Sequence, residues 1–135
     1  MAHRHAILLI EDEPELALLL EEVLERYEVH SAGSMRRALE LLETFRPCVV
    51  ISDLSLPDVA RDQVVASIRT AAPGVPIVLM SAIATQDLEE TAREQGADRI
   101  VSKPFEIEDF EASLVFLCPP EQEREAPPES AGQDV

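Results

Sequence analysis

The run Cys48-Val-Val-Ile-Ser52 is short and almost wholly apolar, and Asp53 follows it at once. Near-continuous apolar runs of this length are typical of strands that are buried on both faces of a parallel sheet. Three similar runs stand along the chain: Ala6-Ile-Leu-Leu-Ile10, Pro76-Ile-Val-Leu-Met80 and the weaker Arg99-Ile-Val-Ser102. A poorer strand, Tyr27-Glu-Val-His30, is expected at an edge of the sheet.

Amphipathic segments fill the intervals between these runs. Apolar residues recur there at helical spacing, Pro14 suits the first turn of a helix, Ser34 suits an N-cap, and Gly96 suits a helix end. The helices are expected at residues 14–26, 34–45, 62–71, 85–95 and 106–117. Five strands alternating with five helices predict an α/β fold, a doubly wound five-stranded parallel sheet with helices on both faces.

Length and charge narrow the classes of function. The 135 residues fit one domain. With 27 acidic and 11 basic residues, the formal net charge is −16. Direct binding to nucleic acid or to an anionic membrane is therefore not expected, because both need clustered Lys and Arg. The N-terminal apolar run is too short for a signal peptide or a membrane span, so we expect no membrane insertion and a cytoplasmic location.

The two cysteines, Cys48 and Cys118, fit no metal-binding or redox spacing. Each lies in an apolar context, so two buried free thiols are expected, and nothing indicates an oxidising compartment. His3 and His5 lie in a terminal segment that is expected to fray. An incidental role is therefore favoured for both histidines over a metal site.

The composition changes after Cys118. Residues 119–135 are rich in Pro and Glu and contain almost no core-forming side chains. This composition is typical of a disordered segment. We therefore expect a folded domain over residues 1–118 and a disordered Pro/Glu-rich tail or linker over residues 119–135.

Polar residues gather at the carboxyl ends of the predicted strands, where binding sites form in such sheets. Glu11 and Asp12 follow the first strand, Asp53 ends the third, Ser81 follows the fourth and Lys103 follows the fifth. Each alone is explained as a turn former, a cap or a surface charge. Crowded carboxylates favour a divalent cation, and oxygen-only ligands point to Mg²⁺. An Asp can attack phosphorus while Lys and Ser hold the phosphoryl oxygens.

At these residues the sequence resembles the receiver domain of two-component response regulators. The resemblance covers about residues 5–118 and makes residues 1–118 the receiver domain. It rests on five blocks in the right order: Ile7-Leu-Leu-Ile-Glu-Asp-Glu13, Ile51-Ser-Asp-Leu-Ser-Leu-Pro-Asp58, Val78-Leu-Met-Ser-Ala82, Gln95-Gly-Ala-Asp98 and Lys103-Pro-Phe105. The blocks together are far more specific than any one alone.

The resemblance implies a flavodoxin-like sheet of order 2-1-3-4-5 and a phosphorylation-controlled signalling switch. Such a domain accepts a phosphoryl group from a histidine kinase or phosphotransfer protein and changes the face it offers to an output protein, which the sequence does not name. It modifies only itself and is not a turnover enzyme.

Carried over position by position, the resemblance assigns roles to single residues. Asp53 would accept the phosphoryl group, and Ser81 and Lys103 would contact its oxygens. The implied Mg²⁺ ligands are Asp12, Asp53, the carbonyl of Ser55 and, through water, Glu11. The peptide bond between Lys103 and Pro104 is expected to be cis.

Three features depart from the family pattern. Ile100 stands at the switch position, where the family usually has Tyr or Phe, and Ile has no ring to swing inward on phosphorylation. Arg61 stands where the loop usually carries Gly, so we expect a rebuilt loop. No effector domain follows Cys118, which leaves a stand-alone receiver and an excised piece of a larger regulator as alternatives.

The lifetime of the phosphoryl group is expected to depend on Ser55 and Ile83. In the family, the side chains at these two positions approach the water that hydrolyses the phosphoaspartate. Ser55 is short and Ile83 cannot hydrogen-bond a water, so slow self-dephosphorylation is expected. An Ile83 that merely packs on the neighbouring loop is an equal alternative.

Two other functions compete with the switch. A receiver-like interaction module with an altered or phosphate-independent readout is supported by Ile100 and Arg61 and opposed by the intact Asp53, Ser81 and Lys103. A metal-dependent phosphohydrolase would need a second acidic residue just after the nucleophile, which is absent after Asp53. Flavin binding is disfavoured because no Ser/Thr/Gly-rich phosphate loop follows the first strand.

Overall fold

The computed structural model describes residues 5–82 and 86–118. Five parallel strands form one sheet in the order β2-β1-β3-β4-β5. The predicted flavodoxin-like order is therefore confirmed, and so is the edge position of the second strand. The strands are β1 (Ala6–Ile10), β2 (Glu28–Ala32), β3 (Val49–Asp53), β4 (Ile77–Ser81) and β5 (Arg99–Ser102).

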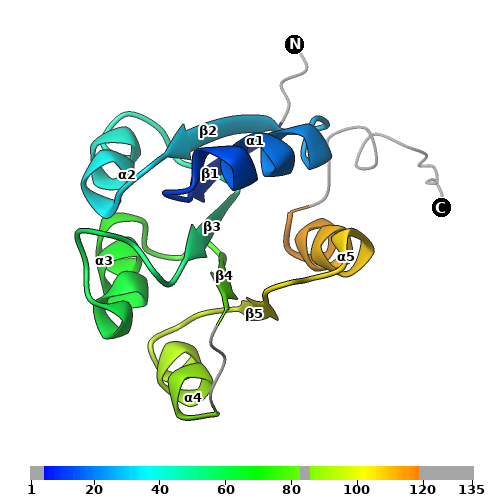
Figure 1. The fold of residues 1–135 in the computed structure, drawn as a ribbon. Helices are drawn as coiled ribbons and strands as arrows, with labels where there is room; N and C mark the ends of the chain where they lie inside the picture. The colour runs from blue at the N-terminus through cyan, green and yellow to red at the C-terminus, as the bar shows by residue number, and fades with distance from the viewer. Residues whose placement is uncertain (1–4, 83–85, 119–135) are drawn as a thin grey trace, which may run out of the picture.

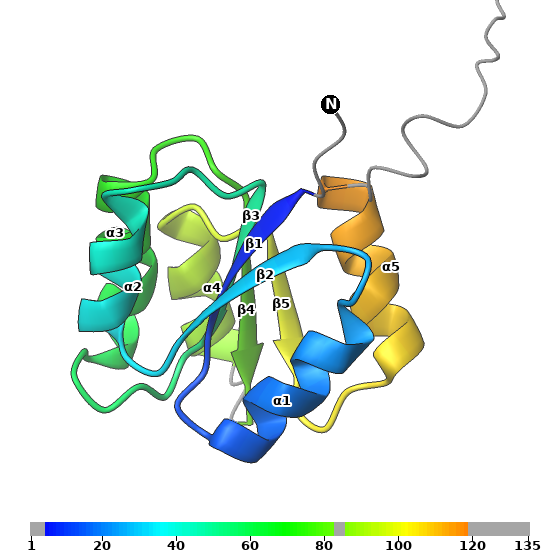
Figure 2. The same ribbon diagram turned by 90° about the horizontal axis from the view of Figure 1, so that it is seen from above.

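Helices cover both faces of this sheet, as predicted. In Figure 2, α1 and α5 lie on one side of the sheet, while α2, α3 and α4 lie on the other. Figure 1 shows the same helices and strands coloured by their position in the sequence. None of the described helices is long and apolar enough to cross a membrane. The helices are α1 (Pro14–Val23), α2 (Met35–Leu42), the 3-10 turn η1 (Arg61–Gln63), α3 (Val64–Ala71), α4 (Gln86–Glu94) and α5 (Ile107–Leu117).

Two hydrophobic cores flank the sheet, and they explain the continuous apolar runs. Alternate residues of β1 enter opposite cores: Leu8 and Ile10 pack on the side of α2 and α3, whereas Ile7 and Leu9 pack on the side of α1 and α5. The same division runs through β3 and β4, in which every residue is buried. A strand with two buried faces needs apolar side chains at consecutive positions.

Local signals explain some of the helix boundaries. The Ser34 side chain accepts a hydrogen bond from the backbone N–H of Arg37, which makes it the predicted N-cap of α2. Gly96 has φ +113° just after α4, a left-handed conformation that favours glycine and ends the helix. The helix predicted over 14–26 ends earlier, at Val23.

The loop after β3 places Arg61, the residue at the expected glycine position, at the start of a short helical turn. Arg61 opens the right-handed turn η1, so its backbone avoids the left-handed region. Before it, Leu56 and Val59 form an isolated antiparallel bridge. The Asp58 carboxylate accepts hydrogen bonds from the first backbone N–H groups of α2. The loop is thereby tied to a neighbouring helix.

The expectation of two free thiols is wrong, because Cys48 and Cys118 form a disulfide. Cys48 directly precedes β3 and Cys118 directly follows α5, so the fold brings their Cα atoms to 6.0 Å across 70 residues of sequence. Sequence spacing carries no trace of such a tertiary contact. His5 lies beside this disulfide, with its Nδ1 3.4 Å from Sγ of Cys118. His3 lies outside the described residues.

Candidate functional site

The predicted polar residues meet at the carboxyl edge of the sheet. Glu11 and Asp12 follow β1, and Lys103 follows β5. Asp53 is the last residue of β3, and Ser81 is the last residue of β4 rather than the one after it. Because the central strands are parallel and in register, their ends deliver these groups to one place.

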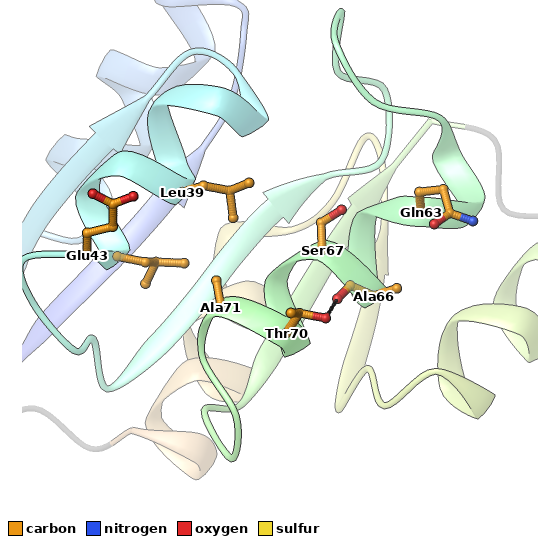
Figure 3. A pocket seen from close by; sticks show the side chains of 8 residues that line it. Leu39, Glu43, Gln63, Ala66, Ser67, Thr70 and Ala71 are labelled. Atoms are coloured by element: carbon orange, nitrogen blue, oxygen red, sulfur yellow. Dashed lines mark hydrogen bonds between the residues drawn. The ribbon is translucent and has the colours of Figure 1, made fainter.

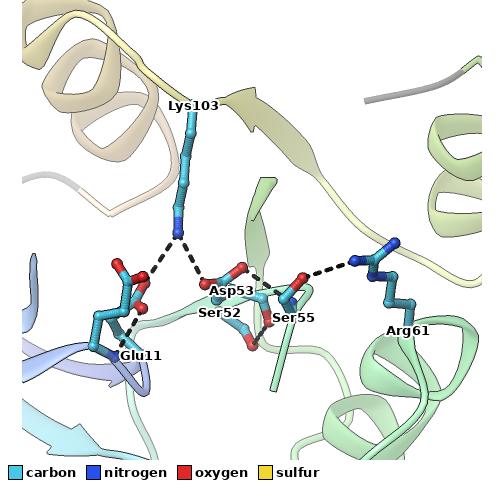
Figure 4. A network of polar contacts seen from close by, with 7 residues as sticks. Glu11, Ser52, Asp53, Ser55, Arg61 and Lys103 are labelled. Atoms are coloured by element: carbon cyan, nitrogen blue, oxygen red, sulfur yellow. Dashed lines mark hydrogen bonds and ion pairs between the residues drawn. The ribbon is translucent and has the colours of Figure 1, made fainter. Parts of the chain in front are cut away.

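Lys103 joins the acidic groups of two strands. Its Nζ donates to Oδ2 of Asp53 at 2.8 Å and to Oε1 of Glu11 at 3.4 Å (Figure 4). The backbone N–H of Lys103 donates to the carbonyl of Ser81 at 2.7 Å. The Lys103–Pro104 peptide bond is cis, as expected. The ammonium group is therefore anchored at the end of β4 and directed at the two carboxylates.

Asp53 is nearly buried and held in one orientation. It is 5% exposed. The backbone N–H of Ser55 donates to its Oδ1 at 3.0 Å, while Lys103 holds Oδ2. The hydroxyl of Ser52 donates to the Asp53 carbonyl at 2.9 Å. Each carboxylate oxygen thus has a fixed donor, so a reacting oxygen needs little reorientation.

Three carboxylates gather in a way that suits a divalent cation. One carboxylate oxygen from each of Glu11, Asp12 and Asp53 can be chosen so that all three lie within 4.8 Å of one another. Glu11 and Asp53 are buried, whereas Asp12 is exposed and lies on the solvent side. Hard oxygen donors of this kind fit Mg²⁺, which keeps several waters. No contact of the Ser55 carbonyl distinguishes it as a further ligand, so that role stays a prediction.

The electrostatics of Glu11 and Lys103 are strongly perturbed. Burial raises the pKa of Glu11 to about 7, the Glu13 backbone N–H opposes this shift, and the charge of Asp53 adds to it. Burial alone would lower the pKa of Lys103, but its hydrogen bond and charge attraction to Asp53, followed by those to Glu11, hold the pKa above its usual value. The clustered carboxylates at this edge repel one another, and a bound cation would relieve that repulsion.

Ser81 and Ile100 lie on neighbouring strands next to the site. Ser81 is 5% exposed and pairs with Ser102 at the ends of β4 and β5. Ile100 pairs with Leu79 in the register and packs, partly buried, against the core on the α2–α4 side. An aliphatic side chain therefore occupies the predicted switch position. Ile83 lies outside the described residues.

One contact at this site was not predicted from the sequence. Nη2 of Arg61 donates to Oγ of Ser55 at 3.2 Å, and the backbone N–H of Ser55 in turn holds Asp53 (Figure 4). A second cation thus approaches the site from η1. The sequence signal was the replacement of the loop glycine by Arg, which indicated a changed loop but not the direction of the side chain.

A surface hollow of about 580 Å³ lies elsewhere, between α2 and α3 (Figure 3). Glu43 is the one ionisable group among the residues that line it. Glu11 and Lys103, whose pKa values are both raised, lie instead at the carboxyl edge of the sheet. Chemistry is therefore assigned to that edge and not to the hollow.

Comparison with known proteins identifies the family of this chain. The family model of the response regulator receiver domain matches residues 7–115. The chain belongs to this family. It is 39% identical over 108 residues to the transcriptional regulatory protein PdtaR of Mycobacterium tuberculosis (strain CDC 1551 / Oshkosh), a match that covers 77% of this chain and 52% of that protein. This receiver therefore spans about half the length of that relative.

Solved structures resemble this receiver over most of its length. The chemotaxis protein CheY4 of Vibrio cholerae superimposes with a TM-score of 0.78 at 23% identity, over 86% of this chain and 99% of that one, and shares the fold. A response regulator of Burkholderia pseudomallei, whose structure contains a phosphorylated aspartic acid, a calcium ion and citrate, gives a TM-score of 0.75 at 27% identity. That match covers 82% of this chain and 66% of the other.

Proposed function

We propose that this receiver is a phosphorylation-controlled switch in which Asp53 accepts a phosphoryl group from a histidine kinase or phosphotransfer protein. The observation that carries the proposal is the arrangement of Lys103 between Asp53 and Glu11 at the carboxyl edge of the sheet. Both carboxylates are nearly buried, which distinguishes this arrangement from an ordinary surface ion pair. A cation held over a buried carboxylate is suited to a reaction that builds negative charge there.

In the transfer step, a carboxylate oxygen of Asp53 forms a bond to phosphorus while the phosphorus–nitrogen bond of a phosphohistidine breaks. The electron pair of that bond stays on the imidazole nitrogen, which takes up a proton. Lys103 offsets the charge on the phosphoryl oxygens, and we assign the Ser81 hydroxyl to the same task. The Ser55 backbone N–H keeps the carboxylate oriented during attack.

We assign Mg²⁺ to Asp12, Asp53, the Ser55 carbonyl and, through water, Glu11. The clustered carboxylate oxygens and the raised pKa of Glu11 support a cation at this point. When bound, Mg²⁺ supplies charge neutralisation for the phosphoryl oxygens and for the acidic groups. The phosphorylated aspartic acid and the calcium ion in the Burkholderia pseudomallei regulator are consistent with this assignment.

We propose that phosphorylation changes the conformation of the loop after Ser81 more than that of β5. Ile100 is packed against the core and carries no polar tip or ring that could exchange partners. The alternative, an interaction module whose binding does not depend on phosphate, is favoured by Ile100 and Arg61. In both readings its output partner is a second protein.

Phosphorylation by acetyl phosphate tests the proposal and separates it from this alternative. Purified protein is incubated with the donor and with Mg²⁺ or EDTA, and the phosphoryl adduct is measured by intact mass. The switch predicts an adduct that forms with Mg²⁺ and is lost with EDTA. A protein that gains no adduct at any Mg²⁺ concentration is a phosphate-independent module, and steady turnover of a phosphate ester would indicate a hydrolase.

A further inference from the structure

A second cluster of metal-ligand side chains lies at the opposite edge of the sheet. His5 directly precedes β1, Cys48 directly precedes β3, and Cys118 directly follows α5. The candidate ligand atoms of these three residues lie within 4.8 Å of one another. Cys48 and Asp53 bracket β3, so about 16 Å of extended chain separates this cluster from the phosphoacceptor.

We propose that His5, Cys48 and Cys118 form a zinc-binding site when the two cysteines are reduced. The disulfide and the zinc complex are then two alternative states of one site. The inference does not rest on phosphorylation of Asp53, because neither its residues nor its chemistry are shared with the acidic edge.

The donors lie close enough together for tetrahedral coordination once the disulfide is opened. Zinc lies ~2.3 Å from a thiolate and ~2.0–2.1 Å from an imidazole nitrogen, so tetrahedral angles place these two ligands about 3.5 Å apart. Nδ1 of His5 lies 3.4 Å from Sγ of Cys118. The Cα atoms of Cys48 and Cys118 are 6.0 Å apart. Rotation about each Cα–Cβ bond would let both sulfurs face one ion once the disulfide is reduced.

The backbone beneath each ligand is already fixed. The carbonyl of His5 accepts from the N–H of Glu28 at 2.9 Å, and the N–H of Cys48 donates to the carbonyl of Ala6 at 2.7 Å. The carbonyl of Cys118 accepts from the buried hydroxyl of Tyr27, also at 2.7 Å. Three segments far apart in sequence are thereby held in place without the metal. The protein backbone therefore loses little conformational entropy when a metal binds here.

The donor types select zinc over the cation of the acidic edge. Two thiolates and one imidazole are soft or borderline ligands, which suit Zn²⁺ and not Mg²⁺. The acidic edge offers carboxylate oxygens, which suit Mg²⁺. The three side chains leave a fourth position of the tetrahedron for water or another donor.

Binding requires reduction of the disulfide, and the site allows it. A small-molecule thiol of the glutathione class attacks one sulfur; two such thiols become one disulfide as Cys48 and Cys118 become thiols. Zn²⁺ then displaces one proton from each thiol and binds the neutral imidazole of His5. Cys48 is partly exposed and Cys118 is buried, so attack at Cys48 is the accessible route.

The test is zinc binding by the full chain in saturating Mg²⁺, with and without prior reduction by a phosphine (which supplies no competing thiolate), measured by competition with a chromophoric chelator. The reduced protein should bind one Zn²⁺ per chain, and the oxidised protein should not. His5→Gln should weaken binding by more than about 100-fold, because even residues that only orient a ligand are worth ~10–100-fold. Cys48→Ser should have an effect at least as large.

Two matched variants act as controls. His30→Gln removes a histidine on β2 that bonds Glu28 instead, and Asp53→Asn removes an acidic ligand of the opposite edge. Both should bind zinc as wild type does. Co²⁺ in place of Zn²⁺ should give a thiolate charge-transfer band that Cys48→Ser reduces.

Absence of zinc binding by the reduced protein would overturn the proposal. So would binding that His5→Gln and Cys48→Ser leave unchanged, or that Asp53→Asn abolishes. His5 is only partly buried, so His5→Gln keeps the test decisive if a cysteine variant fails to fold.

Discussion

Nζ of Lys103 lies 2.8 Å from Oδ2 of Asp53, although the two residues are 50 positions apart in sequence. Asp53 ends the central strand β3 and Lys103 follows the edge strand β5, with β4 between them. The same ammonium group also bonds Glu11 after β1. One cation therefore balances carboxylates from two strands, and its loss should affect both the chemistry and the charge at this edge.

Replacing Lys103 by Met should slow phosphorylation without preventing folding. The variant lacks the charge that stabilises the phosphoryl oxygens, and loss of one such donor typically costs ~10²–10³-fold in rate. The initial rate with acetyl phosphate and saturating Mg²⁺ measures this. Lys103→Arg, which keeps the charge, should retain part of the rate. A Met variant as fast as wild type would remove Lys103 from the reaction.

Replacing Glu11 by Gln should stabilise the protein in Mg²⁺-free buffer, and more so at higher pH. The pKa of Glu11 rises from 4.5 to about 7 on folding, mainly through burial. Between these values the folded state binds more protons than the unfolded state, so the wild-type contribution to stability falls as pH rises. Gln cannot ionise, so above pH 7 the free energy of unfolding of the variant should exceed that of wild type by about 1–3 kcal/mol.

Urea unfolding at several pH values checks this expectation for Glu11. The difference between variant and wild type should grow between pH 4.5 and 7 and then level off. Glu13→Gln, which changes an exposed neighbour, should show no such trend. A Glu11→Gln variant that is less stable than wild type at pH 8 would contradict the burial argument.

Phosphorylation should change the Ser81 loop more than the surface of β5. Ile100 has restricted side-chain torsions and no polar group to exchange partners. Amide chemical shifts with and without beryllofluoride, a mimic of the phosphoryl group, measure both regions. Changes at Ile100 and Val101 as large as those at Ser81 and Ala82 would show that β5 transmits the signal after all.

Deleting residues 120–135 should leave the free energy of unfolding within about 0.5 kcal/mol of wild type, since changes away from a packed core have effects of this size. The segment has almost no apolar side chains to bury. Chemical denaturation of the shortened and full chains makes the comparison. A loss of several kcal/mol would mean that the segment docks on the domain.

The sheet could be predicted because burial on two faces leaves a strong pattern in the sequence. Continuous apolar runs marked β1, β3 and β4, and the alternation with helices predicted the layers. The site could be predicted because parallel strands bring their ends together, so that residues as distant as Glu11 and Lys103 became neighbours on topological grounds. A cytoplasmic location remains a prediction of the sequence.

Specific contacts between side chains could not be predicted from the sequence. The disulfide of Cys48 and Cys118 depends on where α5 ends relative to β3. The bond from Arg61 to Ser55 depends on the local path of the loop, which the missing glycine signalled without showing its direction. Such contacts depend on tertiary packing rather than on a periodic pattern.

The most direct test of the central claim is the site of phosphorylation. Wild type, Asp53→Asn and Asp62→Asn are incubated with radiolabelled acetyl phosphate and Mg²⁺, and incorporated label is counted. Asp62 is an exposed carboxylate in η1, so its replacement controls for loss of an acidic residue near the site. The account predicts full labelling of wild type and Asp62→Asn and none of Asp53→Asn. Equal labelling of Asp53→Asn and wild type would contradict it.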